Sequence, residues 1–179
     1  MIQRQSHSTI YVIDQEEALR FYRDILAFEV NTDMPMDDSG LRWLTLNPKG
    51  QPDLELILAQ VTSGPMFDDG IAEEMRALVE RGAFGIGVFE TDDIQSDYER
   101  LSSQGVEFVS PPQERFYGTE AIVKDNSGNW FSLTQSKRLS SYKTPEQGDI
   151  CRRGLSVHGV SRSRDHCALY FWVDASHAR

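Results

Sequence analysis

The order strand, helix and three strands occurs twice along the sequence, and this internal repeat limits the fold more than any single motif. Alternating apolar residues at 7–13 predict the first strand, and apolar residues at helical spacing predict a helix over 15–26. The second copy begins about 78 residues later, with a strand over 84–92 and a helix over 94–105. Three further strands complete each copy: 28–32, 41–48 and 53–59 in the first, and 106–110, 115–125 and 129–135 in the second.

Acidic residues and glycines mark the ends of the predicted helices. Asp14 precedes the first helix and Asp92 or Asp93 precedes the second, where a carboxylate can accept from free backbone N–H groups. A further helix, 68–82, links the two copies and ends at Gly82. Turn-forming residues fill the intervals between strands: 34–40, 48–53, 111–114 and 126–129.

Two βαβββ modules in one chain make an α+β fold. The first module spans about 5–60 and the second about 83–135. One module leaves its curved sheet open on one side, so two modules side by side form a paired half-barrel with a cavity on the concave face. We therefore expect one domain over 1–136, with any site on the concave face of the sheets.

Charge separates this domain from the end of the chain. Residues 1–136 hold 10 Lys and Arg against 24 Asp and Glu, whereas residues 137–179 hold 8 against 4 and include three of the four histidines. We expect 137–179 to be a C-terminal extension, either an accessory segment or a non-native read-through. The two cysteines, Cys151 and Cys167, make no disulfide framework.

The net charge of −10 argues against nucleic acid as a partner, because such binding needs a basic surface. It suits a cationic ligand, although acidity for solubility is the simpler explanation. Apolar runs are too short for a membrane span, and the alternating N-terminus does not resemble a signal peptide. These features predict a cytoplasmic protein with no membrane partner.

Segments of both modules resemble the vicinal oxygen chelate superfamily, the group of glyoxalases, bleomycin resistance proteins and extradiol dioxygenases. The resemblance covers about residues 5–135 and is carried by HSTIYVIDQEEALRFYRDILAFEV, DLELIL, GVFETDDI, GVEF and KDNSGNWFSLTQ. It implies that the chain forms a homodimer, with sites to which both subunits contribute. It does not by itself fix an activity, because this fold supports many chemistries.

Metal enzymes of this superfamily bind one divalent ion with four side chains, two from each module. By resemblance, His7 and Glu55 occupy the two positions of the first module, and both can coordinate a metal. The corresponding positions of the second module hold Ile86 and Ser132. Isoleucine cannot coordinate and a serine hydroxyl is a poor ligand, so we expect no metal cofactor, with a divalent metal as the alternative.

His7 and Glu55 can also be interpreted without a metal. A lone carboxylate facing a cavity costs free energy unless it is paired, so Glu55 is expected to meet His7, Arg42 or a ligand. Such a His–Glu pair would serve either as a metal-free acid–base pair or as a structural contact. Strand parity puts seven further residues on the same side as the four metal-ligand positions: Tyr11, Trp43, Thr45, Ile57, Val88, Glu90 and Trp130. The predicted ligand-binding residues on this side are Tyr11, Trp43, Ile86, Glu90, Trp130 and Ser132.

Three functions are consistent with this pattern. The favoured one is a small-molecule-binding protein of the bleomycin resistance type, with an aromatic-lined groove and no complete metal site. The second is a metal-dependent lyase or isomerase resembling glyoxalase I, or a dioxygenase of the same type. The third is a metal-free acid–base enzyme that uses His7 and Glu55 as its catalytic residues.

Overall fold

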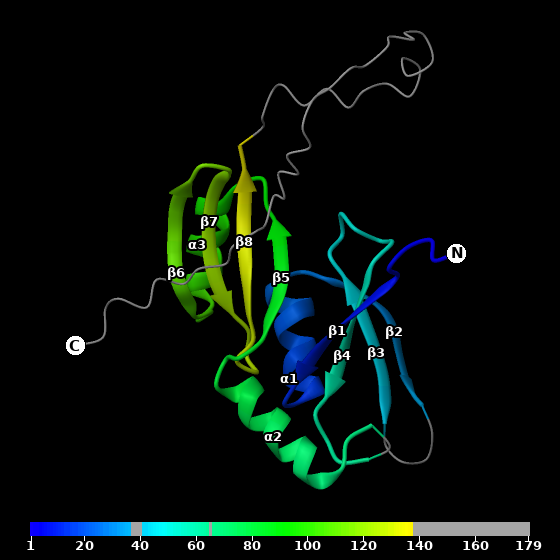
Figure 1. Ribbon diagram of the computed structural model, residues 1–179. Coiled ribbons are helices and arrows are strands. Elements are labelled where there is room, and N and C mark those ends of the chain that lie inside the picture. Colours follow the sequence, from blue (N-terminus) through cyan, green and yellow to red (C-terminus); the bar gives the residue numbers. More distant parts are fainter. Residues whose placement is uncertain (37–40, 65, 138–179) are drawn as a thin grey trace, which may run out of the picture. The chain divides into compact units, whose positions relative to one another are not determined.

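The computed structural model describes residues 1–36, 41–64 and 66–137, which belong to one unit, Met1–Arg138. The elements of the first module are β1 (His7–Val12), α1 (Gln15–Arg20), the π-helical turn η1 (Phe21–Ile25), β2 (Glu29–Pro35), β3 (Arg42–Asn47) and β4 (Glu55–Gln60). Helix α2 (Asp69–Glu80) follows, and the second module contains β5 (Gly85–Glu90), α3 (Ile94–Ser103), β6 (Phe108–Arg115), β7 (Gly118–Lys124) and β8 (Trp130–Ser136) (Figure 1). The predicted extension 137–179 lies outside the described residues, apart from Lys137.

Each module forms one four-stranded mixed sheet, and the two sheets repeat the same topology. The strand orders are β1-β4-β3-β2 and β5-β8-β7-β6 (Figure 1). β1 pairs with β4 and β5 with β8 in parallel, whereas the remaining pairs are antiparallel. The predicted α+β fold of two βαβββ modules is confirmed.

Aspartate side chains cap the three α-helices. Asp14 accepts from Glu17 N at 2.9 Å, Asp68 from Ile71 N at 2.9 Å and Asp93 from Ser96 N at 3.0 Å. Each bond satisfies one of the backbone N–H groups that a helix leaves free in its first turn. Of the two caps predicted for α3, the structure therefore selects Asp93.

Strand β6 differs from its prediction. The segment 111–114 was expected to be a turn, yet β6 continues through Pro111 and Pro112 to Arg115. β6 lies at the edge of its sheet, so these prolines do not remove a ladder hydrogen bond on the outer side. The hairpin turn falls instead between Arg115 and Gly118.

Residues alternate between two faces along each strand. One face carries the hydrophobic core shared by both modules, with buried Ile10, Leu44, Leu58, Phe131 and Leu133 among its members. We call the opposite face of each sheet the distal face. Its principal residues are His7, Tyr11, Trp43, Thr45 and Glu55 in the first module, and Val88, Glu90, Glu120, Ser132 and Thr134 in the second.

The turn between β7 and β8 connects the two modules through hydrogen bonds. Tyr22 donates its hydroxyl to Asp125 Oδ2 at 2.8 Å, and Asn129 Nδ2 donates to Tyr11 O at 2.9 Å. Ser127 Oγ accepts from Ile13 N at 3.2 Å. Burial, followed by the nearby Asp125 charge, raises the pKa of Tyr22 well above its usual range.

Among the described residues, no helix combines the length and apolar character required to cross a lipid bilayer.

Candidate functional site on the distal faces

His7 and Glu55 meet on the distal face of the first module. They are direct register partners on β1 and β4, and His7 Nε2 lies 3.7 Å from Glu55 Oε2. Thr45 on β3 donates its hydroxyl to the same carboxylate oxygen at 2.6 Å. The side chains of His7 and Glu55 are 38% and 30% exposed, so both remain accessible to a ligand.

The other contacts of His7 are a hydroxyl and an indole. Ser6 Oγ lies 2.9 Å from His7 Nδ1, and the ring centroids of His7 and Trp43 are 6.0 Å apart. Among the described residues, no group of three or more His, Cys, Asp or Glu is placed to hold a metal ion. His7 and Glu55 thus supply two protein donors, fewer than the three protein ligands of typical catalytic zinc sites. Within the part of the chain that the structure describes, these residues do not fit a complete metal centre.

Aromatic side chains continue this surface beyond His7. The ring of Tyr11 lies 5.9 Å from that of Phe67, which precedes α2, and 6.4 Å from that of Phe84, which precedes β5. Such centroid separations lie within the range of aromatic contacts. Aromatic rings from both modules and from the segment before α2 therefore lie near the two ends of β1.

The distal face of the second module carries a cluster of hydrogen-bonded polar side chains. Ser132 on β8 donates to Glu120 Oε1 at 2.5 Å, and Tyr117 donates to Glu120 Oε2 at 2.8 Å. Ser132 Oγ and Thr134 Oγ1 are 3.0 Å apart. Burial, together with the hydrogen bond to Glu120, raises the pKa of the Tyr117 hydroxyl.

Glu90 and Trp130 lie on the same face of the second module. Glu90 pairs in register with Thr134 and accepts from Ser136 Oγ at 3.2 Å. Trp130 covers Gly85, because a Cβ atom on this glycine would lie 2.6 Å from Trp130 Cζ2. A flat indole can lie so close to β5 only where that strand has no side chain.

The structure corrects the predicted position of Ile86. The resemblance places it with Ser132 on the ligand-facing side, but Ile86 packs against the hydrophobic core. The register between β5 and β8 shifts between Gly85 and Val88, and Gly87 adopts a φ of 127°. This β-bulge adds one residue and moves Val88, 54% exposed, into register with Ser132.

The sequence suggests Glu120 only as a carboxylate that could turn toward the metal position in place of the missing ligands, and Glu120 is not among the predicted ligand-binding residues. Its signal was the same as that of Glu55, a carboxylate within an otherwise apolar strand segment. The neighbouring donors Tyr117 and Ser132 come from different elements, so strand parity alone does not bring the three together.

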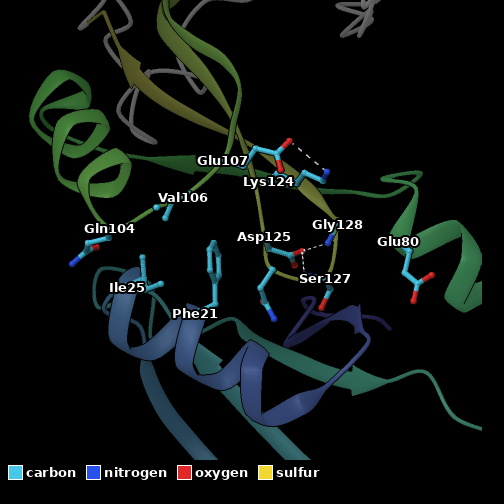
Figure 2. Close-up of a pocket in the computed structure, with 12 residues that line it drawn as sticks. Phe21, Ile25, Glu80, Gln104, Val106, Glu107, Lys124, Asp125, Ser127 and Gly128 are labelled. Carbon is cyan, nitrogen blue, oxygen red and sulfur yellow. Dashed lines mark hydrogen bonds and ion pairs between the residues drawn. The ribbon is translucent and has the colours of Figure 1, made fainter.

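A separate, solvent-open depression of about 530 Å³ lies away from these residues, and Figure 2 shows its lining side chains. Phe21 and Ile25 of η1, Val106 after α3 and the β7–β8 turn contribute to it. None of the predicted site residues lines it. The oxygens of Asp125 already accept hydrogen bonds from donors of the β7–β8 turn and from Tyr22. We therefore interpret this depression as part of the contact between the two modules.

Comparison with known proteins identifies the family. The sequence model of the Glyoxalase/Bleomycin resistance protein/Dioxygenase superfamily matches residues 4–133. The chain belongs to this superfamily. Among solved structures, UcmS2 is 44% identical with a TM-score of 0.71, and the match covers 76% of this chain and 100% of UcmS2.

Two further similar proteins, one of known structure, show lower identity to this chain. TnmS3, an antibiotic binding protein from Streptomyces sp. CB03234, is 29% identical with a TM-score of 0.59, covering 76% of this chain and 98% of TnmS3. A protein of Shewanella frigidimarina is 34% identical over 129 residues, which are 72% of this chain and 90% of that protein.

Proposed function

We propose that this superfamily member binds a small aromatic molecule on the ring-lined surface along β1 without transforming it. The observation that carries the proposal is the ring-lined surface along β1, where His7 lies beside Trp43 and Tyr11 lies beside Phe67 and Phe84. Rings of this kind offer flat apolar area to a planar ligand, and each favourable ring pair contributes about 0.5–1.5 kcal/mol beyond area burial.

The comparisons support the same function. TnmS3 binds an antibiotic, according to its description, and it has the same fold at 29% identity. A protein that sequesters an antibiotic needs affinity and no chemical step, which agrees with the incomplete donor set around His7 and Glu55. Within this proposal the protein uses no cofactor and acts as a cytoplasmic homodimer whose sites draw on both subunits.

Thermal shift screening of the full chain against planar aromatic compounds tests the proposal. A ligand that binds only the folded state stabilises that state, by about 2.7 kcal/mol at a concentration one hundred times its Kd. This stabilisation is observed as a higher unfolding temperature. Trp43→Ala should weaken the binding of a hit, whereas Trp43→Phe keeps an aromatic ring and should retain most of it. Recovery of a chemically altered compound, or the failure of every planar compound to stabilise the protein, would contradict the proposal.

A metal-free acid–base enzyme is the second candidate. The 3.7 Å separation of His7 Nε2 and Glu55 Oε2 favours it, because a carboxylate next to an imidazole can orient it for proton transfer. This candidate requires turnover that survives in EDTA and disappears in Glu55→Gln. The binding function requires instead that Glu55→Gln leaves the bound molecule chemically unchanged.

A further inference from the structure

We propose that Gln15, the first residue of α1, is a positioning residue for ligand binding, because it sets the place of Trp43 on the ring-lined surface. The inference rests on the proposed function and goes beyond it, since it gives a part in recognition to a helix that packs in the core. Gln15 would act through the backbone of β3 rather than by contact with the ligand.

The side-chain amide of Gln15 binds two strands at once. Gln15 is buried, and its Nε2 donates to Leu58 O of β4 at 2.6 Å and to Arg42 O of β3 at 3.2 Å. A side-chain amide has two N–H donors, so these two bonds use both of them. The carbonyl of Arg42 belongs to the peptide group that ends at the nitrogen of Trp43. Gln15 therefore holds the main chain directly before the indole.

The pairing between β3 and β4 shows where this amide lies. Each strand has six residues, and all of them are described by the structure. Only two pairs of these residues are in register: Thr45 with Ile57 and Leu46 with Leu56. Near Arg42 and Leu58 the ladder has ended, and the Gln15 amide bonds instead to one carbonyl of each strand. Buried carbonyls need a donor, so this amide replaces ladder hydrogen bonds and holds the two strands apart.

The second module offers an internal comparison, because its corresponding strands pair fully. β7 is in register with β8 over all seven of its residues, Gly118–Lys124. The first residue of α3, which corresponds to Gln15 in the repeat, is Ile94. Ile94 is buried in the core, and its side chain has no hydrogen-bond donor. The open end of the ladder thus occurs in the module whose helix begins with an amide.

The next residue of α1 holds the side chain of Arg42. Arg42 Nη1 donates to Glu16 Oε1, while Nε and Nη2 donate to the two carboxylate oxygens of Asp33 on β2 at 2.6 and 2.7 Å. Gln15 and Glu16 therefore hold the main chain and the guanidinium of the same residue. The beginning of β3 is fixed to the beginning of α1 by both contacts.

This contact fixes Trp43 relative to the rings along β1. The chain runs from Tyr11 near the end of β1 directly into the start of α1, so Gln15 links the two parts of the surface. Without the amide, the two carbonyls regain partners if β3 closes onto β4. Trp43 would move with β3, away from its place 6.0 Å from the ring of His7. A planar ligand would then lose one of its ring contacts.

Fluorescence titration of the full chain with acridine at pH 8 tests the role of Gln15, and urea denaturation checks that each variant is folded. Gln15→Met keeps the length of the side chain and removes both donors. It should raise the Kd for acridine by about 2–10-fold, which corresponds to the loss of one ring contact. Gln15→Ile is the second variant, because it copies the residue type that begins α3, and it should raise the Kd to a similar extent.

A double-mutant cycle separates positioning from a general loss of structure. If Gln15 acts through Trp43, Gln15→Met should change the Kd by less than about 1.5-fold in a Trp43→Ala background. Gln95→Met is the matched control, because Gln95 is exposed on α3 and its amide donates to Glu99 at 2.8 Å. This control should leave the Kd of the otherwise unchanged chain within about 1.5-fold.

The outcomes separate the positioning role from the proposed function. If acridine binds the wild type and neither Gln15→Met nor Gln15→Ile changes the Kd, positioning is refuted and aromatic binding stands. An equal loss of affinity with and without Trp43 also refutes positioning, and so does a lower urea midpoint with an unchanged Kd. If acridine does not bind the wild type, the aromatic binding on which the inference rests fails instead.

Discussion

Substitution of Asp125 by alanine should destabilise the protein strongly, because this carboxylate binds donors from both modules. Asp125 is 6% exposed. Its Oδ1 accepts from the backbone N–H groups of Ser127, Gly128 and Asn129, each at 2.9 Å. Its Oδ2 accepts from Tyr22 at 2.8 Å and from Asn129 Nδ2 at 2.9 Å.

The magnitude follows from the donors that would lose their acceptor. Asn129 Nδ2 keeps its bond to Tyr11 O, and Gly128 N keeps a bond to Asp125 O at 3.2 Å. Three donors would be left without an acceptor: the Tyr22 hydroxyl and the backbone N–H groups of Ser127 and Asn129. An unsatisfied buried donor costs about 1–3 kcal/mol, so three of them should lower the free energy of unfolding of Asp125→Ala by about 3–9 kcal/mol. That is a large fraction of the roughly 5–15 kcal/mol of a whole domain.

Urea denaturation followed by circular dichroism measures this loss as a lower midpoint with an unchanged slope. Tyr22→Phe removes one donor and keeps the ring contacts with Phe21 and Phe28, so it should cost about 1–2 kcal/mol. Asp53→Ala is the matched control, because the Asp53 side chain is 90% exposed, and it should change stability by less than about 0.5 kcal/mol. Equal effects of Asp125→Ala and Asp53→Ala on stability would refute the claim that Asp125 stabilises the contact between the two modules.

Three further predictions concern the backbone, pH and metal. Gly128→Ala should destabilise the protein by about 1–3 kcal/mol in urea titrations, because Gly128 has a φ of 113° and an added Cβ would lie 2.4 Å from Val79 O. Gly50→Ala is the control and should be close to neutral, because a Cβ at Gly50 meets no atom within 4 Å. The raised pKa of Tyr22 favours the neutral hydroxyl in the folded state, so its contribution is complete below about pH 10 and is lost as pH rises through the folded pKa. Ultraviolet titration should show a late-ionising tyrosine that Tyr22→Phe removes, and a normal titration of the wild type would contradict this. Elemental analysis of protein purified without chelator should find less than one divalent metal per chain, and a stoichiometric metal lost in His7→Ala would overturn the binding function.

The repeat and its helix caps could be predicted because they depend on local patterns. Alternation and helical spacing identify the elements of both modules, and Asp14 caps its helix as the sequence indicates. The sequence left His7, Arg42 or a ligand open as the partner of Glu55, and the resemblance put His7 and Glu55 on neighbouring strands; the structure has His7 as the neighbour of Glu55. These features need no knowledge of the contacts between modules.

The bulge in β5 could not be predicted from alternation. A strand pattern assumes a constant period of two, and one inserted residue moves every preceding side chain to the other face. Gly87 was the local sign of such an irregularity, but a glycine within a strand has several explanations. The continuation of β6 through Pro111 also could not be predicted, because proline predicts a turn unless the strand is known to lie at the edge of its sheet.

The alternation of side chains along each strand divides the sequence into two sets of positions that can vary separately. Core positions such as Leu44 and Phe131 stabilise the fold, while under the proposed function distal positions such as Trp43 decide what the protein binds. Drift in ligand preference can therefore proceed without loss of the scaffold, in keeping with the retention of the TnmS3 fold at 29% identity. A combinatorial library confined to the distal positions would turn this chain into a starting point for receptors of new small molecules.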